Sequence, residues 1–155
     1  MSEHVAEVAW SREGADFGVD YDRTHEWRFD GGVTVPASSA PALYGDPTRV
    51  DPEEAFVAAI SSCHLMWFLY LAADAGLVVD SYVDHAVGVM ERIGPGQQAI
   101  TEVDLRPEIE WADEAPSAAV VSALHHESHR RCFIANSVKS HITVHGRDVS
   151  AASAG

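Results

Sequence analysis

The two cysteines of this chain lie in unequal surroundings, and they are the residues best suited to chemistry. Cys63 lies in the middle of a long apolar stretch, whereas Cys132 directly follows a polar segment that ends in two arginines. A thiolate is a nucleophile and can be oxidised reversibly, so two thiols that meet in the fold predict a redox cycle. The alternative is that both are buried and act only as small hydrophobic side chains.

Histidines near the second cysteine offer a competing chemistry. His125, His129 and Cys132 fall at positions i, i+4 and i+7, so they share one face of a helix. Cys and His are zinc ligands, and a Cys/His zinc-binding protein is therefore an alternative. Against it, the chain has no Cys-x-x-Cys or His-Glu-x-x-His pattern. We expect no metal and no resident cofactor, and whether this face binds metal stays open.

Composition limits the partners. The chain has 155 residues, of which 46% are hydrophobic and 22% charged, and this suits one domain over residues 1–149 with a flexible tail at 150–155. A net charge of −14 argues against nucleic acid and against a membrane surface. The N-terminus lacks the basic and apolar segments of a secretion signal, so we expect a cytoplasmic protein.

Three short strands are expected before the first long helix. Alternation predicts strands over Val5–Trp10 and Glu26–Asp30. A Gly-Gly turn then leads to a third strand, Val33–Val35, which Pro36 should end. The stretch 37–50 is rich in proline, serine and threonine and predicts a loop.

A long helix should follow this loop. Asp51 is a good N-cap and Pro52 suits the first helical position, while Gly76 predicts the end of the helix after about Ala75. Apolar residues occupy most of its circumference. Polar residues in its middle argue against a membrane span, so we expect a helix buried on most sides inside a protein or a dimer.

The second half of the chain predicts a hairpin, a helix and a strand. Val79–Arg92 and Ala99–Trp111 alternate on either side of a Gly-Pro-Gly turn. A helix from Ser117 to His129 and a strand over Ser140–His145 follow. The order β-β-β-α-β-β-α-β predicts an α+β fold in which an antiparallel sheet packs on two long helices. The apolar stripe of the second helix consists of Val120, Val121 and Leu124.

Two motifs in these elements resemble the OsmC/Ohr family of thiol-dependent peroxidases. The helix start Asp51-Pro52-Glu53-Glu54 places Glu53 ten residues before Cys63, as in that family. Cys132 lies between the second helix and the closing strand, where the family has its second cysteine. The segment Tyr21–Trp27 is similar to that of an OsmC-like branch other than the best-studied Ohr and OsmC proteins.

The resemblance implies an antioxidant enzyme of the oxidative stress response that reduces organic hydroperoxides or hydrogen peroxide. Cys63 would be the peroxidatic thiolate, and Cys132 would resolve its sulfenic acid as a Cys63–Cys132 disulfide. A dithiol reductant, such as a lipoyl or thioredoxin-type protein, would restore both thiols. The family also implies an intertwined homodimer.

A thiolate in the middle of an apolar helix needs a nearby cation. The family uses an arginine from the N-terminal strands, held by the helix-start glutamate, which is Glu53 here. Arg23 and Arg28 are the candidates, and we favour Arg23 because Arg28 fits the solvent face of a strand. Ten residues of helix rise about 15 Å, so Glu53 should serve the Cys63 of the other subunit in a symmetric dimer.

Residues beside Cys63 are candidates for the substrate pocket. His64, Trp67 and Phe68 follow it on the same helix, although aromatic residues at helical spacing are more often part of the core. A small-ligand-binding protein on the same fold, catalytically silent, is a further alternative because fold does not fix function. Such a protein would have no need of a second thiol near the first.

Overall fold

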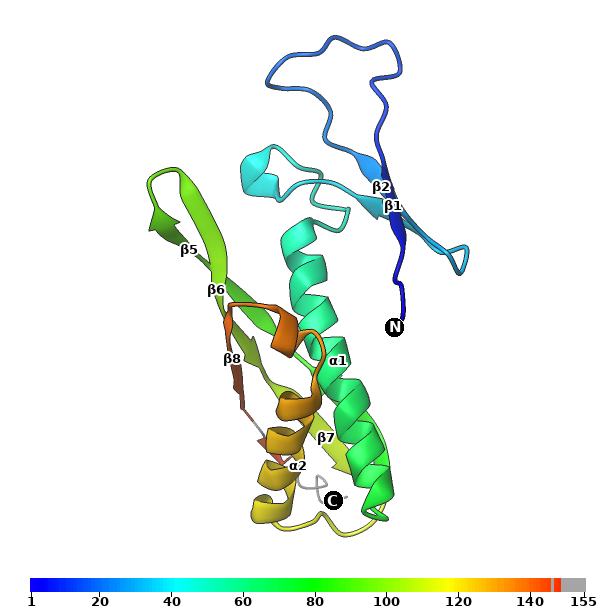
Figure 1. Cartoon of the computed structure of the whole chain (residues 1–155), viewed down its shortest axis with the longest axis vertical. Coiled ribbons are helices and arrows are strands. Elements are labelled where there is room, and N and C mark those ends of the chain that lie inside the picture. Colours follow the sequence, from blue (N-terminus) through cyan, green and yellow to red (C-terminus); the bar gives the residue numbers. More distant parts are fainter. Residues whose placement is uncertain (146, 149–155) are drawn as a thin grey trace, which may run out of the picture. The chain divides into compact units, whose positions relative to one another are not determined.

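The computed structural model describes residues 1–145, 147 and 148. These fall into two compact units, Met1–Ala55 and Phe56–Gly155, each of which is considered by itself. The expected class is confirmed, since the chain combines two long helices with mainly antiparallel sheets (Figure 1). The tail predicted at 150–155 lies outside the described residues.

The N-terminal unit contains the three predicted strands as one antiparallel sheet. β1 (Ala6–Ala9), β2 (His25–Phe29) and β3 (Thr34–Ala37) lie in that order. The prediction that Pro36 ends the third strand is wrong, because Pro36 pairs with Glu26 inside β3. The Pro36 carbonyl faces away from β2 and accepts from the Val50 amide at 3.2 Å, so the missing N–H costs no β2–β3 hydrogen bond.

The loop before the first long helix holds a short 3-10 helix, Pro41–Leu43, and then α1 (Pro52–Asp74) begins where predicted. The Glu54 amide donates to Asp51 Oδ1 at 2.7 Å, and the Asp51 amide donates to Glu54 Oε2 at 3.2 Å. This reciprocal capping box satisfies two backbone donors at the start of the helix. At the other end Gly76, with φ of +72°, allows the Leu77 amide to close on the Ala72 carbonyl at 2.9 Å.

The two long strands predicted for the hairpin are each divided in the C-terminal unit. The breaks fall at residues 85–86 and at Arg106. At this point the Asp84 carboxylate accepts hydrogen bonds from the Arg106 amide and from the Ser61 hydroxyl of α1. Where the strands bend, hydrogen bonds to the Asp84 side chain thus stand in for part of the backbone hydrogen bonding between the strands. The four resulting strands are β4 (Val79–Asp84), β5 (Val87–Gly94), β6 (Gln97–Leu105) and β7 (Pro107–Trp111).

Two three-stranded sheets result, with orders β4-β7-β9 and β5-β6-β8. The closing strand β8 (His141–Val144) confirms the prediction for 140–145, and β9 (Arg147–Asp148) was not predicted. Both pair in parallel, β8 with β6 and β9 with β7. The expectation of a purely antiparallel sheet is therefore wrong for these two pairs.

The second helix, α2 (Ala118–Arg131), begins after the Ser117 cap and runs two residues beyond the predicted end. The apolar stripe predicted for it is partly wrong. Val121 is buried but Val120 is exposed, because the helix turns His125 and Ser128 inward. A further 3-10 turn, Ala135–Ser137, leads towards β8.

The core of the C-terminal unit follows one line along α1. Its buried residues recur every fourth position, so they form a narrow stripe. Ile60 packs with Val103 and Leu105, while Phe68 packs with Ala72 and Ile109. α1 therefore covers both sheets, and α2 lies beside its C-terminal half (Figure 1).

One side of α1 is uncovered in the single chain. Met66 is 66% exposed and Tyr70 58% exposed, so the predicted burial on most sides is not met within one chain. By length and composition α1 is also able to cross a membrane. One such helix is weak evidence, because core helices of soluble proteins pass the same test.

Candidate functional site

The C-terminal unit brings the two cysteines together. Cys63 lies half-buried in the middle of α1, and Cys132 is buried at the C-terminal cap of α2. Their thiols are close enough to interact, since Cys63 is among the causes that raise the pKa of Cys132, and neither forms a disulfide. Two thiols that are distant in the sequence are thus neighbours in the fold.

The surroundings of Cys132 keep its thiol protonated. Burial, and after it the interaction with Cys63, raise the pKa of Cys132 to about 11. The Ala135 amide donates to Cys132 Sγ at 3.3 Å and opposes this rise. A protonated Cys132 is a donor to Cys63, so a negative charge on this pair is best placed on Cys63.

An aromatic group lies next to the thiol pair. Trp67, one turn beyond Cys63, meets Phe133 edge to face with ring centroids 5.6 Å apart. The Arg131 guanidinium lies 5.5 Å from the centre of the Trp67 ring and also bonds Glu127 at 2.5 Å. Phe133 is 69% exposed and is a residue that sequence reasoning missed, although its position directly after Cys132 was a signal.

His64 and Phe68 lie in the core. His64 is fully buried, and its Nε2 is 3.0 Å from Nδ1 of His125 on α2, with the two rings stacked. Burial lowers the pKa of His64 to about 3, and the charges of His125 and His129 add to this. Phe68 is also fully buried, with its ring 4.5 Å from that of His125. These two side chains expose no surface to a substrate.

The alternative of a zinc site finds no ligand set in the described residues. Over 1–145, 147 and 148, no group of three or more His, Cys, Asp or Glu side chains is placed to hold a metal ion. On the face predicted from His125, His129 and Cys132, His125 is directed at His64 and Cys132 at Cys63.

The two candidate arginines of the N-terminal unit have different partners. Arg28 on β2 bonds Glu7 at 2.6 Å and Glu26 at 2.9 Å, and these partners raise its pKa. Arg23 bonds two backbone carbonyls, those of Tyr21 and Val19, both at 2.7 Å. Arg28 is thus committed to surface ion pairs, whereas Arg23 has no ion pair within the described part of the chain.

Glu53 lies half-buried in the first turn of α1. The capping box uses Glu54 and Asp51, so Glu53 is not needed to cap the helix. Within the described residues Glu53 makes no side-chain hydrogen bond or ion pair. A role for it beyond the helix start is therefore left open by the local structure.

Comparison with known proteins gives a consistent result. A family model of OsmC-like proteins matches residues 45–145. An OsmC-like protein of unknown function from Vibrio cholerae is 41% identical, with a TM-score of 0.88 over 94% of this chain and 99% of that one. No match is found among curated proteins.

More distant structures share the fold. An organic hydroperoxide resistance protein from Elizabethkingia anophelis, with thiocyanate bound, is 18% identical with a TM-score of 0.71, covering 93% of each chain. The organic hydroperoxide resistance protein OsmC of Legionella pneumophila is 14% identical with a TM-score of 0.69, over 93% of this chain and 94% of that one. At these identities the likeness concerns the fold alone.

Proposed function

This chain belongs to the OsmC-like protein family, and from that premise we propose that it is a thiol-dependent peroxidase acting on organic hydroperoxides or hydrogen peroxide. The observation that carries the proposal is the proximity of the Cys132 and Cys63 thiols, both of them free. The names of the hydroperoxide resistance proteins that share its fold support the substrate class.

In the first step the Cys63 thiolate attacks the terminal oxygen of the peroxide. The S–O bond forms as the O–O bond breaks, so Cys63 becomes a sulfenic acid and the leaving alkoxide takes a proton from solvent to give an alcohol. Cys63 is suited to this role because it is the more accessible thiol, while Cys132 retains its proton.

In the second step the Cys132 sulfur attacks the Cys63 sulfur. The disulfide forms, the S–O bond breaks, and the oxygen leaves as water with the Cys132 proton. An external dithiol, of the lipoyl or thioredoxin type, then donates two electrons and two protons and becomes a disulfide itself. This cycle requires no resident cofactor, and we expect it in the reducing cytoplasm.

Arg23 is the proposed cation for the Cys63 thiolate, with Glu53 as its partner. Arg28 is a poorer choice because Glu7 and Glu26 already neutralise it. Glu53 and Cys63 lie ten residues apart on α1, a rise of about 15 Å, so Glu53 would serve a second copy of the chain.

A homodimer accordingly forms part of the proposal. The uncovered apolar side of α1, which includes Met66 and Tyr70, supplies a surface for a symmetric partner. The expected mass in solution is twice the 16.7 kDa of one chain. A catalytically silent ligand-binding protein is the second candidate function, favoured by a largely apolar pocket in the N-terminal unit whose lining includes Trp10 and Phe17.

The test is intact mass and free-thiol count before and after about one equivalent of cumene hydroperoxide. Loss of both thiols with a mass decrease of about two daltons, reversed by a dithiol, is expected. In Cys132→Ser the product should instead be a single Cys63 sulfenic acid, trapped by dimedone. Survival of both wild-type thiols would refute the proposal and leave the ligand-binding function.

A further inference from the structure

The N-terminal unit contains a pocket of about 640 Å³, within the range of small-molecule sites. Most of its wall is aromatic or aliphatic, and a single arginine lies within it. The lining residues that carry the argument are Trp10, Phe17, Tyr21, Arg23, Leu43 and Tyr44. All of them precede residue 45, where the match to the OsmC-like family model begins. Pro52 also lines the pocket and is the one lining residue that falls within that match.

Three rings form one wall of the pocket. Trp10, Phe17 and Tyr21 contact one another with centroid distances of 5.7, 5.6 and 5.3 Å. Phe17 is nonetheless 67% exposed, and Tyr44 is 82% exposed. Large aromatic side chains gathered at the surface around a hollow are typical of a binding site. A flat apolar ligand would remove this surface from water.

Arg23 is held rigidly but is not neutralised. Its guanidinium lies 4.6 Å from the centre of the Tyr21 ring and 5.2 Å from that of Tyr44. Two of its five N–H donors bond the carbonyls of Tyr21 and Val19. In the described part of the chain it pairs with no carboxylate, so it keeps a full positive charge beside the aromatic wall.

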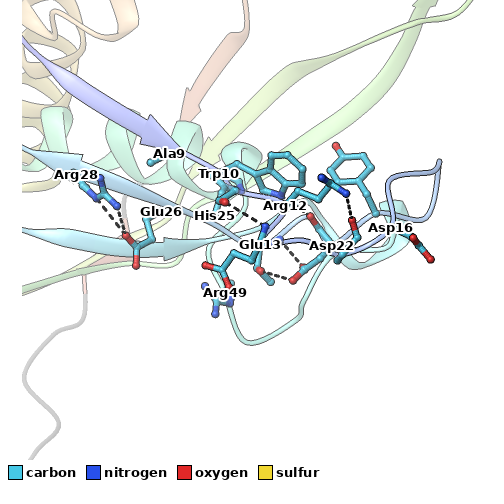
Figure 2. A pocket seen from close by; sticks show the side chains of 14 residues that line it. Ala9, Trp10, Arg12, Glu13, Asp16, Asp22, His25, Glu26, Arg28 and Arg49 are labelled. Carbon is cyan, nitrogen blue, oxygen red and sulfur yellow. Dashed lines mark hydrogen bonds and ion pairs between the residues drawn. The ribbon is translucent and has the colours of Figure 1, made fainter.

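A neighbouring polar pocket provides the contrast. It shares Trp10, Tyr21 and His25 with the aromatic pocket, and Figure 2 shows the side chains that line the polar pocket. There Arg28 bonds Glu26, and Arg49 pairs with Asp46 at 3.5 Å. Those cations are already satisfied by acidic side chains. Arg12 also lines the polar pocket, and within the described residues it bonds only the Ala15 carbonyl, at 2.8 Å. What distinguishes Arg23 is therefore the aromatic wall beside its charge.

We propose that the aromatic pocket binds an aryl carboxylate, with the ring against Trp10, Phe17 and Tyr21 and the carboxylate on Arg23. The chain as a whole, with its charge of −14, repels anions, so a local arginine is required for such a ligand. A guanidinium offers a carboxylate paired N–H donors. The ligand and its aromatic wall go beyond the peroxidase cycle, but the site shares Arg23 with the cation proposed for Cys63, so a bound carboxylate and the thiolate would compete for the same guanidinium.

The experiment uses the full-length chain with Cys63→Ser, so that thiol chemistry cannot enter. Naphthoate is titrated by calorimetry and by NMR of the four tryptophan indoles, each assigned through its own Trp→Phe variant. A saturable shift of the Trp10 indole signal is expected, with a dissociation constant below about 1 mM. Arg23→Gln should weaken binding about 10-fold or more, whereas Arg28→Gln should leave it within about twofold.

A second variant guards against misfolding of Arg23→Gln. Tyr44 is exposed and so can be truncated safely; Tyr44→Ala should weaken naphthoate and the neutral naphthalene methanol to the same extent. Three results would overturn the proposal: no saturable Trp10 shift, shifts confined to the other tryptophans, or equal losses in Arg23→Gln and Arg28→Gln. A naphthoate site in a chain whose wild-type thiols ignore peroxide would refute the peroxidase alone.

Discussion

Two pairs of polar side chains join α1 to α2, and they differ in what they can do. Cys63 meets Cys132, and one residue further along α1 His64 meets His125. Burial acts on both pairs. It raises the pKa of Cys132 to about 11 and lowers that of His64 to about 3, because a thiol ionises to an anion and an imidazole to a cation.

Cys132 and His64 are therefore held neutral at rest, and solvent access separates the two pairs. His64 is fully buried, while Cys63 keeps part of its surface. Successive residues on a helix point about 100° apart, so one step along α1 moves a side chain from the sealed core to the accessible edge. The thiol pair can meet a substrate, and the imidazole pair can only hold the two helices together.

The largest effect is expected from removing the accessible thiol. Cys63→Ser should abolish peroxide turnover, and Cys132→Ser should permit one oxidation and then stop, because no second thiol resolves the sulfenic acid. Ser62→Ala, a change at the exposed neighbour of Cys63, is the matched control and should retain turnover. Coupled consumption of a dithiol is the measurement. Peroxide turnover in Cys63→Ser would show that the thiol pair, like the imidazole pair, takes no part in catalysis.

A second prediction concerns the protonated thiol. Burial is the largest cause of the raised pKa of Cys132 and remains in the Cys63→Ser chain, although the contribution of Cys63 is lost. Cys132 in that chain should therefore alkylate at least about 10-fold more slowly at pH 8 than a free thiol. The rate with iodoacetamide should continue to rise above pH 9. Urea-unfolded protein supplies the reference rate. Alkylation as fast in the folded as in the unfolded chain would show that burial does not protect this thiol.

Much of the fold was predictable from local signals. The Asp51 cap and Gly76 fix both ends of α1, because capping depends on residues within one turn. The division of the two long strands was not predictable. It depends on the Asp84 carboxylate, whose partners Ser61 and Arg106 are more than twenty residues away on either side.

The candidate site, like the fold, was predictable only in part. The resemblance to the OsmC/Ohr family implied that Cys132 reaches Cys63, and the structure has the two thiols near each other. Sequence did not reveal that His64 and Phe68 point into the core, because alternation around a helix apolar on most sides does not select a face. The buried face is chosen by the sheets and by His125 of α2, which are distant in sequence.

The imidazole pair should make stability depend on acid. Unfolded His64 binds a proton below its ordinary pKa of 6.5, whereas folded His64 does so only near 3, so stability is lost as pH falls through this window. At pH 5 the loss is about 2 kcal/mol relative to neutral pH. Urea unfolding at pH 5 and 7.5 measures it. His64→Leu should flatten the slope and the exposed His126→Ala should keep it; equal slopes in all three chains would contradict the assignment.

The smallest expected effect tests whether the thiol pair, unlike the imidazole pair, depends on a distant cation. Arg23→Ala should slow oxidation of Cys63 by about 10-fold, since an opposite charge favours a thiolate by at least about one pKa unit. Arg28→Ala removes an arginine already paired with Glu7 and Glu26 and should change the rate by less than about twofold. Stopped-flow rates with cumene hydroperoxide across pH distinguish the two, because loss of the activating cation moves the rate profile to higher pH. Equal rates in both variants would place the activating charge elsewhere, and Arg131, which stacks on Trp67 beside the thiols, would be the next arginine to change.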